Sequence, residues 1–316
     1  MSDKVSHSTS TTTEVGQTRA KKRRGDVVFA AISRGAGFTI LIALAGVGIF
    51  LTIQGLPALT ADDFKGADSL YGYVWPLVFG TVLAAIIALL LATPLSIAVA
   101  LISSHYAPKR LAVPIGYVID LLAAVPSVVY GLWGILYLGP KIVPVYAWLH
   151  DNLGWLPFFA TEADVTGATI LTVGVVLAIM ILPIISAIMR DIFAQTPTLH
   201  QEAALALGAT RWEMIRMTVF PYARSGMVSA TMLGLGRALG ETMAVAMILS
   251  ATGAVTFNLI GSQNPSTIAA NIALQFPESS GIDINVLVFS GLVLFALTFA
   301  VNFAARAIVE RTGRIS

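Results

Sequence analysis

The sequence has no cysteine and only four histidines in 316 residues. The absence of cysteine excludes disulfide bonds, thiol catalysis and cysteine-ligated zinc or iron–sulfur sites. The histidines lie far apart and show no metal-ligand spacing: His7, His105, His150 and His200. No Gly-Lys dipeptide occurs, which excludes a Walker A loop. We therefore expect no catalytic residue, no metal site and no cofactor, and any ATP hydrolysis would belong to another subunit.

Charged residues are also scarce. Only 11% of the residues are charged and 56% are hydrophobic, which is the composition of a membrane protein. Six segments reach the ~20 apolar residues that a transmembrane helix needs. They are residues 35–56, 75–102, 111–138, 168–189, 225–251 and 284–308. The sequence therefore predicts an all-α integral membrane protein with six transmembrane helices, surrounded by a lipid bilayer and without a nucleic-acid partner.

The charges that are present are divided between the two sides of these segments. Sixteen of the 19 Lys and Arg residues lie in the N-terminal tail, the second and fourth loops and the C-terminus. The other loops hold Lys65 and Lys141 among eight acidic residues. The positive-inside rule therefore places both termini in the cytoplasm. Residues 1–30, rich in Ser and Thr and basic at 21–24, are expected to be a disordered cytoplasmic tail, and residues 31–316 a six-helix domain.

The fourth loop, residues 190–224, contains helix-forming sequence that is too polar to cross the membrane. Charged side chains near the middle of a bilayer cost about 2.5–3.5 kcal/mol each, and residues 201–222 carry Glu202, Arg211, Glu213 and Arg216. Capping-box patterns at residues 198–201 and 210–213 predict two short helices with a turn at Gly208, ended by Pro221. Two capped helices on one face favour a docking surface. An amphipathic loop lying on lipid headgroups is the alternative.

Three ionisable residues lie well inside the predicted spans: Asp120, Arg237 and Glu241. Such charges usually mark a transport pathway, because they are costly in hydrocarbon. Arg237 and Glu241 are four residues apart, on one face of a continuous helix, and all three side chains are expected to meet one water-filled cavity. The alternative is a self-neutralised Arg237–Glu241 pair that only stabilises helix packing.

The loop carries a resemblance to a known family. The segment EAALALGATRWEMIRMTVFP resembles the EAA loop of ABC importer permeases, with Glu202, Ala203, Ala204, Gly208 and Pro221 in register. Thr218 and Phe220 stand where that pattern usually has Ile and Leu. The resemblance implies that this loop, including Arg211 and Trp212, fits into a cleft of a cytoplasmic ATPase.

Two further segments resemble one group of these permeases. LGRALGETMAVAM, residues 235–247, and VPSVVYGLWG, residues 125–134, are similar to segments of the phosphate-specific ABC importers, and the similarity extends over residues 75–310. It implies the type I importer permease fold in a bacterial inner membrane. The implied partners are a second, homologous permease subunit, an ATPase dimer and an external phosphate-binding protein.

The three intramembrane charges call for a further cation if the ion is phosphate, and two alternative functions stay open. Asp120, Arg237 and Glu241 together carry a net negative charge, which is unfavourable for phosphate, so we expect a partner permease to supply a further cation. A permease for sulfate or molybdate is the nearest alternative. An ion-coupled secondary carrier, with Asp120 and Glu241 as relay carboxylates, is the other, although it leaves the loop helices unexplained.

Overall fold

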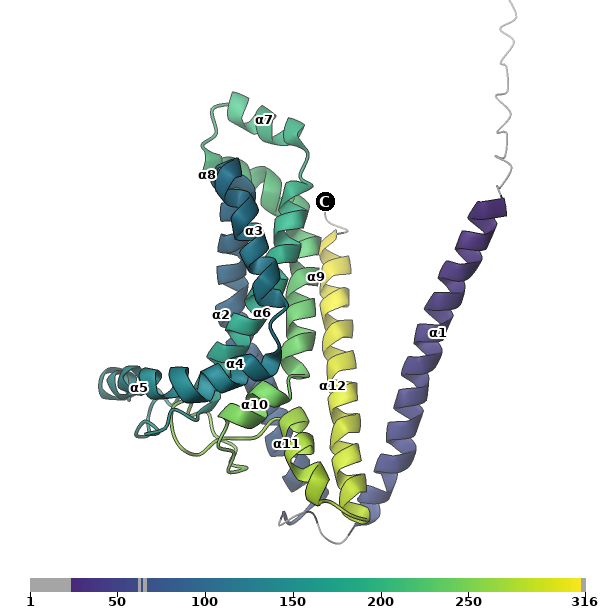
Figure 1. Cartoon of the computed structure of the whole chain (residues 1–316), viewed down its shortest axis with the longest axis vertical. Coiled ribbons are helices and arrows are strands. Elements are labelled where there is room, and N and C mark those ends of the chain that lie inside the picture. Colours follow the sequence, from purple (N-terminus) through teal and green to yellow (C-terminus); the bar gives the residue numbers. More distant parts are fainter. Residues whose placement is uncertain (1–23, 62–63, 65–66, 314–316) are drawn as a thin grey trace, which may run out of the picture. The chain divides into compact units, whose positions relative to one another are not determined.

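The protein is helical throughout the part that its computed structural model describes, residues 24–61, 64 and 67–313. Within these residues the only extended pairing is an isolated bridge between Phe64 and Ala67. The α-helices of Figure 1 are α1 (Arg24–Gly55), α2 (Leu70–Leu101), α3 (Lys109–Ala123), α4 (Ser127–Trp133), α5 (Gly139–Leu153), α6 (Ile170–Ala194), α7 (Thr198–Ala206), α8 (Arg211–Met214), α9 (Phe220–Leu239), α10 (Met243–Ile248), α11 (Ile268–Gln275) and α12 (Ile282–Gly313).

Shorter helical segments extend several of these helices. Three are π-helical, Ile102–Tyr106, Gly134–Leu138 and Ile215–Val219, and two are 3-10 helices, Leu56–Thr60 and Phe276–Glu278. The chain divides into two units, residues 1–49 and 50–316. Most of the predicted disordered tail lies outside the described residues, but α1 already begins at Arg24, so the end of that predicted tail is helical. All of the features discussed below belong to the second unit.

Five helical stretches are long and apolar enough to cross a membrane, judged by length and composition. They are Val28–Thr60, Leu70–Tyr106, Ser127–Leu153, Ile170–Ala194 and Ile282–Ala307. Four of them match predicted spans. The third predicted span, 111–138, is wrong in its bounds, because the chain leaves the helix between Ala123 and Ser127 and the long apolar stretch then continues to Leu153. Pro126 lacks an N–H and disfavours helix in the residue before it, which accounts for this break.

The fifth predicted span, 225–251, is also interrupted. α9 ends at Leu239 with Gly240 as its C-cap, and the short helix α10 begins only at Met243. Because α9 carries charged and hydroxylated side chains, it is not among the five apolar stretches. The number of membrane crossings and the side on which the termini lie remain predictions.

Helix α6 forms the centre of the second unit. Its buried side chains face several directions around the helix, and it packs against α2, α3 and α9. Small residues on α2, namely Ala84, Ala85, Ala88, Ala92 and Ser96, allow close approach of the two backbones. Ser96 Oγ donates a hydrogen bond of 3.1 Å to the carbonyl of Leu182 on α6. This packing holds α6 in place, and the neighbouring α9 packs against α6.

Residues 211–239 are helical without a gap. α8 passes through the π-helical segment Ile215–Val219 directly into α9. Pro221 was predicted to end the loop, which is wrong: it lies in the first turn of α9, where its missing N–H is tolerated. Gly226 and Gly234 let α9 approach α6 closely, because a Cβ would lie 2.7 Å from Ile192 Cδ1 at the first position and 2.5 Å from Ile185 Cδ1 at the second.

Candidate functional site

The predicted pair of loop helices exists, joined by a turn at Gly208. α7 ends at Ala206, and Gly208 has a φ of +88°, a conformation that L side chains rarely adopt. The Ala209 N–H donates to the carbonyl of Ala204 at 3.2 Å, which closes the turn. The capping box predicted at residues 198–201 is wrong. Pro197 is the N-cap, without a side-chain cap, and Gln201 Nε2 donates to the carbonyl of Thr196 at 3.0 Å.

The second capping box, at the start of α8, is confirmed. The Thr210 N–H and hydroxyl each donate to Glu213 Oε2 at 2.8 Å, and the Glu213 N–H donates to Thr210 Oγ1 at 3.3 Å. The hydrogen bonds from the Thr210 backbone and side chain lower the pKa of the Glu213 carboxyl. The cap is therefore present at neutral pH, and it is lost only as the pH falls through that lowered pKa.

The loop exposes some of its apolar side chains and packs others against helix α6. Leu207 at the turn is 90% exposed, and it borders a depression of about 550 Å³ with Ala203, Ala204, Gly208 and Glu213. Trp212 packs edge-on against Phe220, with 6.0 Å between ring centroids, and Phe220 lies 6.2 Å from Phe193 of α6. The predicted residues Glu202 and Arg211 are exposed beside them. Figure 1 shows α7 and α8 at one end of the helical bundle.

Glu241 lies in the break between α9 and α10, not on a continuous helix with Arg237. Its residue is 9% exposed, and Glu241 Oε1 accepts a hydrogen bond of 3.2 Å from the Ala244 N–H. The carboxylate thus satisfies an N–H at the start of α10 that has no partner within that helix. Although both residues are described, no ion pair joins Arg237 to Glu241. The self-neutralised pair is therefore absent from this conformation.

The break between α3 and α4 lies against α10. Tyr130 Oη donates a hydrogen bond of 2.9 Å to the carbonyl of Leu122 across the break. A Cβ at Gly131 would lie 3.0 Å from the Cα of Ala244, and one at Gly134 would lie 2.6 Å from Ile248 Cδ1. The two sequence motifs that carry the resemblance, residues 125–134 and 235–247, are thus packed directly on each other, with glycine at the contacts.

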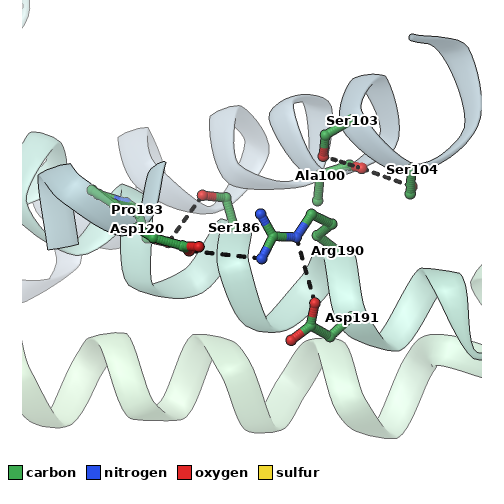
Figure 2. Close-up of polar contacts among 8 residues, drawn as sticks. All are labelled: Ala100, Ser103, Ser104, Asp120, Pro183, Ser186, Arg190 and Asp191. Carbon is green, nitrogen blue, oxygen red and sulfur yellow. Dashed lines mark hydrogen bonds and ion pairs between the residues drawn. The ribbon is translucent and has the colours of Figure 1, made fainter. Parts of the chain in front are cut away.

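Asp120 takes part in an ion pair that the sequence did not predict. Figure 2 shows Asp120 of α3 facing Arg190 of α6, with 3.7 Å between Oδ1 and Nη2. Arg190 Nε also lies 3.4 Å from Oδ1 of Asp191. Gly116, one turn before Asp120, leaves room for the guanidinium, since a Cβ there would meet Nη1 at 2.6 Å. Asp120 thus contributes to the joining of α3 and α6.

Arg237 faces a cavity of about 690 Å³ between α9 and α12. Its lining residues are Ile184, Val228, Ser229, Met232, Leu233, Gly236, Arg237, Asn302, Ala305 and Arg306. Asp120 and Glu241 do not line it, so the expectation that all three charges meet in one cavity is not met. Arg306 and Asn302 were missed because Arg306 was counted among the basic residues of the C-terminus, although the two are four residues apart on α12.

These features define an all-α membrane protein with broken helices and a structured helical loop at one end of the bundle. That is the architecture of a membrane transport subunit. The chain belongs to the family of binding-protein-dependent transport system inner membrane components, whose model matches residues 92–314. It is accordingly a multi-pass inner-membrane protein.

Relatives of known name cover nearly the whole chain. The "Phosphate transport system permease protein PstC 2" of Mycobacterium tuberculosis is 46% identical over 301 residues, covering 90% of this chain and 92% of the relative. The "Phosphate transport system permease protein PstC" of Xylella fastidiosa (strain Temecula1) is 38% identical over 302 residues, covering 92% of each.

A solved structure shows the same fold at low sequence identity. A chain of a bacterial ABC transporter involved in the import of the acidic polysaccharide alginate matches with a TM-score of 0.58 and 14% identity, covering 90% of this chain and 98% of that chain. The predicted type I ABC importer permease fold is thereby confirmed.

The capping box gives a direct test of the loop geometry. In Thr210→Val, the side-chain acceptor for the Glu213 N–H is lost, so hydrogen exchange of that amide is expected to rise roughly fivefold, as for the loss of an N-cap. Hydrogen-exchange mass spectrometry in detergent measures this. Thr218→Val is the control, because that hydroxyl bonds the Met214 carbonyl and caps nothing. Unchanged exchange at Glu213 in Thr210→Val would contradict the cap.

Proposed function

We propose that this chain is the membrane-spanning permease subunit of an ATP-driven importer of inorganic phosphate. The chain has no catalytic site of its own, and a separate cytoplasmic ATPase hydrolyses ATP. The relatives named as phosphate transport system permeases, at 46% and 38% identity, support phosphate as the transported ion. Within the molecule the proposal rests above all on one observation: the exposed loop helix α8 and Arg237 belong to one gap-free helical segment, residues 211–239.

The loop of α7 and α8 is proposed to dock on the ATPase. Its exposed residues Leu207 and Trp212 offer apolar contact, and Glu202 and Arg211 offer charges of both signs for orientation. A surface of mixed charge and defined shape suits a protein partner better than an anionic membrane surface, which favours basic amphipathic helices. The docking surface is cytoplasmic in this proposal, as the charge distribution predicts.

Phosphate is proposed to pass through the cavity that Arg237 lines. Glu241 follows Arg237 by four residues, in the break of the fifth predicted span. Guanidinium groups bind phosphate oxygens through paired hydrogen bonds, which explains an arginine inside the membrane. Discontinuous helices place polar backbone next to transported ions in other carriers. We assign Asp120 a structural role, because its carboxylate is paired with Arg190.

Three partners complete the proposed importer. An external phosphate-binding protein delivers the ion, an ATPase dimer docks on α7 and α8, and a second, homologous permease subunit forms the other wall of the pathway. Arg237, which lines the cavity, is itself exposed in the single chain. A charged membrane cavity of this kind requires another protein surface to close it from lipid.

Removal of the Arg237 charge should stop transport. For Arg237→Ala, uptake of labelled phosphate into cells or proteoliposomes is expected to fall at least about a hundredfold, because a charge-assisted bidentate contact is lost. Glu241→Gln keeps an oxygen for the Ala244 N–H and removes only the charge, so it separates an electrostatic role from capping. Near-normal uptake in both variants, with assembly intact, would contradict the pathway. If sulfate stimulated ATPase activity as much as phosphate does, phosphate specificity would be contradicted.

The docking proposal is tested at the turn. Leu207→Asp places a charge on a 90% exposed apolar residue, so co-purification of the ATPase is expected to fall at least about tenfold. Val165→Asp is the matched control, because Val165 is an aliphatic residue that is 85% exposed in the loop before α6. If Leu207→Asp retains the ATPase as well as Val165→Asp does, the ATPase docks elsewhere.

A further inference from the structure

The cavity that Arg237 faces contains a second cation from the same chain. Arg306 lines it from α12, and Asn302 lies one turn before Arg306. Ser229 adds a hydroxyl from α9, and most other lining side chains are apolar. The lining includes two guanidinium groups and an amide, and no carboxylate among the residues that the structure describes. Such a charge distribution selects an anion that accepts several hydrogen bonds.

Neither arginine has its charge balanced within the described residues. The ion pairs found there join Arg190 to Asp120 and to Asp191, and neither involves Arg237 or Arg306. Glu310 follows Arg306 by four residues on α12, and its side chain lies outside the described part. Two exposed cations in a largely apolar membrane cavity are costly without a counter-charge, which an anionic ligand would provide.

The two arginines lie at different depths. α9 and α12 lie side by side and run in opposite directions, with the C-terminal end of α12 toward α7 and α8 (Figure 1). The lining residues of α9 extend from Val228 to Arg237, about 13 Å at 1.5 Å per residue. Arg237 is the lining residue of α9 farthest from the loop helices, whereas Arg306 is the lining residue of α12 nearest to them.

We propose that Arg306, with Asn302, forms a second oxyanion site in this chain, which receives phosphate from Arg237 before its release on the side of the loop helices. This inference rests on the proposed function. A single intramembrane arginine gives too little positive charge for phosphate, and Arg306 supplies a second one without the partner subunit. The bound group is a tetrahedral phosphate oxyanion held by guanidinium and amide N–H donors.

The same chemistry occurs in a lipid headgroup. A phospholipid whose phosphate contacts Arg306 would place its acyl chains along apolar lining residues such as Val228 and Met232. Free phosphate and lipid phosphate predict different results when the lipid composition is varied. A role in binding transported phosphate gives a defect of the same size in every bilayer, whereas a role in binding a lipid headgroup gives a defect whose size changes with the headgroup offered.

The test uses the complete importer in proteoliposomes, with uptake measured against the concentration of phosphate-loaded binding protein. In Arg306→Gln the maximal uptake rate is expected to fall about tenfold, because a charge-assisted contact downstream of delivery is lost. The half-saturating concentration should stay unchanged, and Arg306→Lys should restore part of the rate. Arg110→Gln is the matched control, because it removes the same charge from an exposed arginine at the start of α3. This variant should transport normally.

Each contrary result has a defined meaning. Normal uptake by Arg306→Gln overturns the second site. A defect whose size differs between phosphatidylglycerol and phosphatidylcholine bilayers assigns Arg306 to a lipid headgroup and also overturns the second site. Glu310→Gln showing the same defect would mean that Arg306 acts through an ion pair on α12. If Arg237→Gln abolishes uptake while Arg306→Gln transports normally, only the second site fails; if both variants transport normally, the proposed pathway itself fails.

Discussion

The gap-free helical segment from Arg211 to Leu239 is the constraint on which the rest of the arrangement depends. A helix transmits displacement along its axis because its backbone hydrogen bonds leave little freedom between turns. At one end Trp212 and Phe220 tie it to Phe193 of α6, and farther along Gly226 and Gly234 hold it close to the same helix. The loop helix α8 and the charged cavity therefore lie at the two ends of one continuous helical segment, which packs on the largely buried helix α6.

The interruptions of the other helices need polar partners, because there is no water in a bilayer core to satisfy free backbone groups. Each break frees backbone groups that must find partners. Tyr130 Oη bonds the Leu122 carbonyl at the break before α4, and Glu241 bonds the Ala244 N–H at the start of α10. The two broken regions pack on each other through Gly131 and Gly134. Polar side chains thus satisfy broken backbone in this conformation.

Local chemistry was readable from the sequence, and long-range pairing was not. The Gly208 turn and the Thr210–Glu213 box were predicted because each depends on residues within one or two turns. The breaks were missed because Pro126 and Gly240 lie inside apolar runs, where composition alone indicates continuous helix. The partner of Asp120 was missed because Arg190 is 70 residues away in the sequence. Arg306 was missed as a cavity residue because it was counted with the basic residues of the C-terminus; its spacing from Asn302 was the available signal.

The most direct test of mechanical coupling along this segment is the insertion of two glycines after Val219, which interrupts the helix between the loop and Arg237 while leaving both intact. ATP hydrolysis and phosphate uptake are measured in the same proteoliposomes containing the complete importer. With the helix interrupted, the ATPase is expected still to dock and hydrolyse ATP, whereas phosphate uptake and the stimulation of hydrolysis by phosphate are expected to be lost. Phosphate uptake within about twofold of the uninterrupted protein, with ordinary stimulation of hydrolysis, would contradict it.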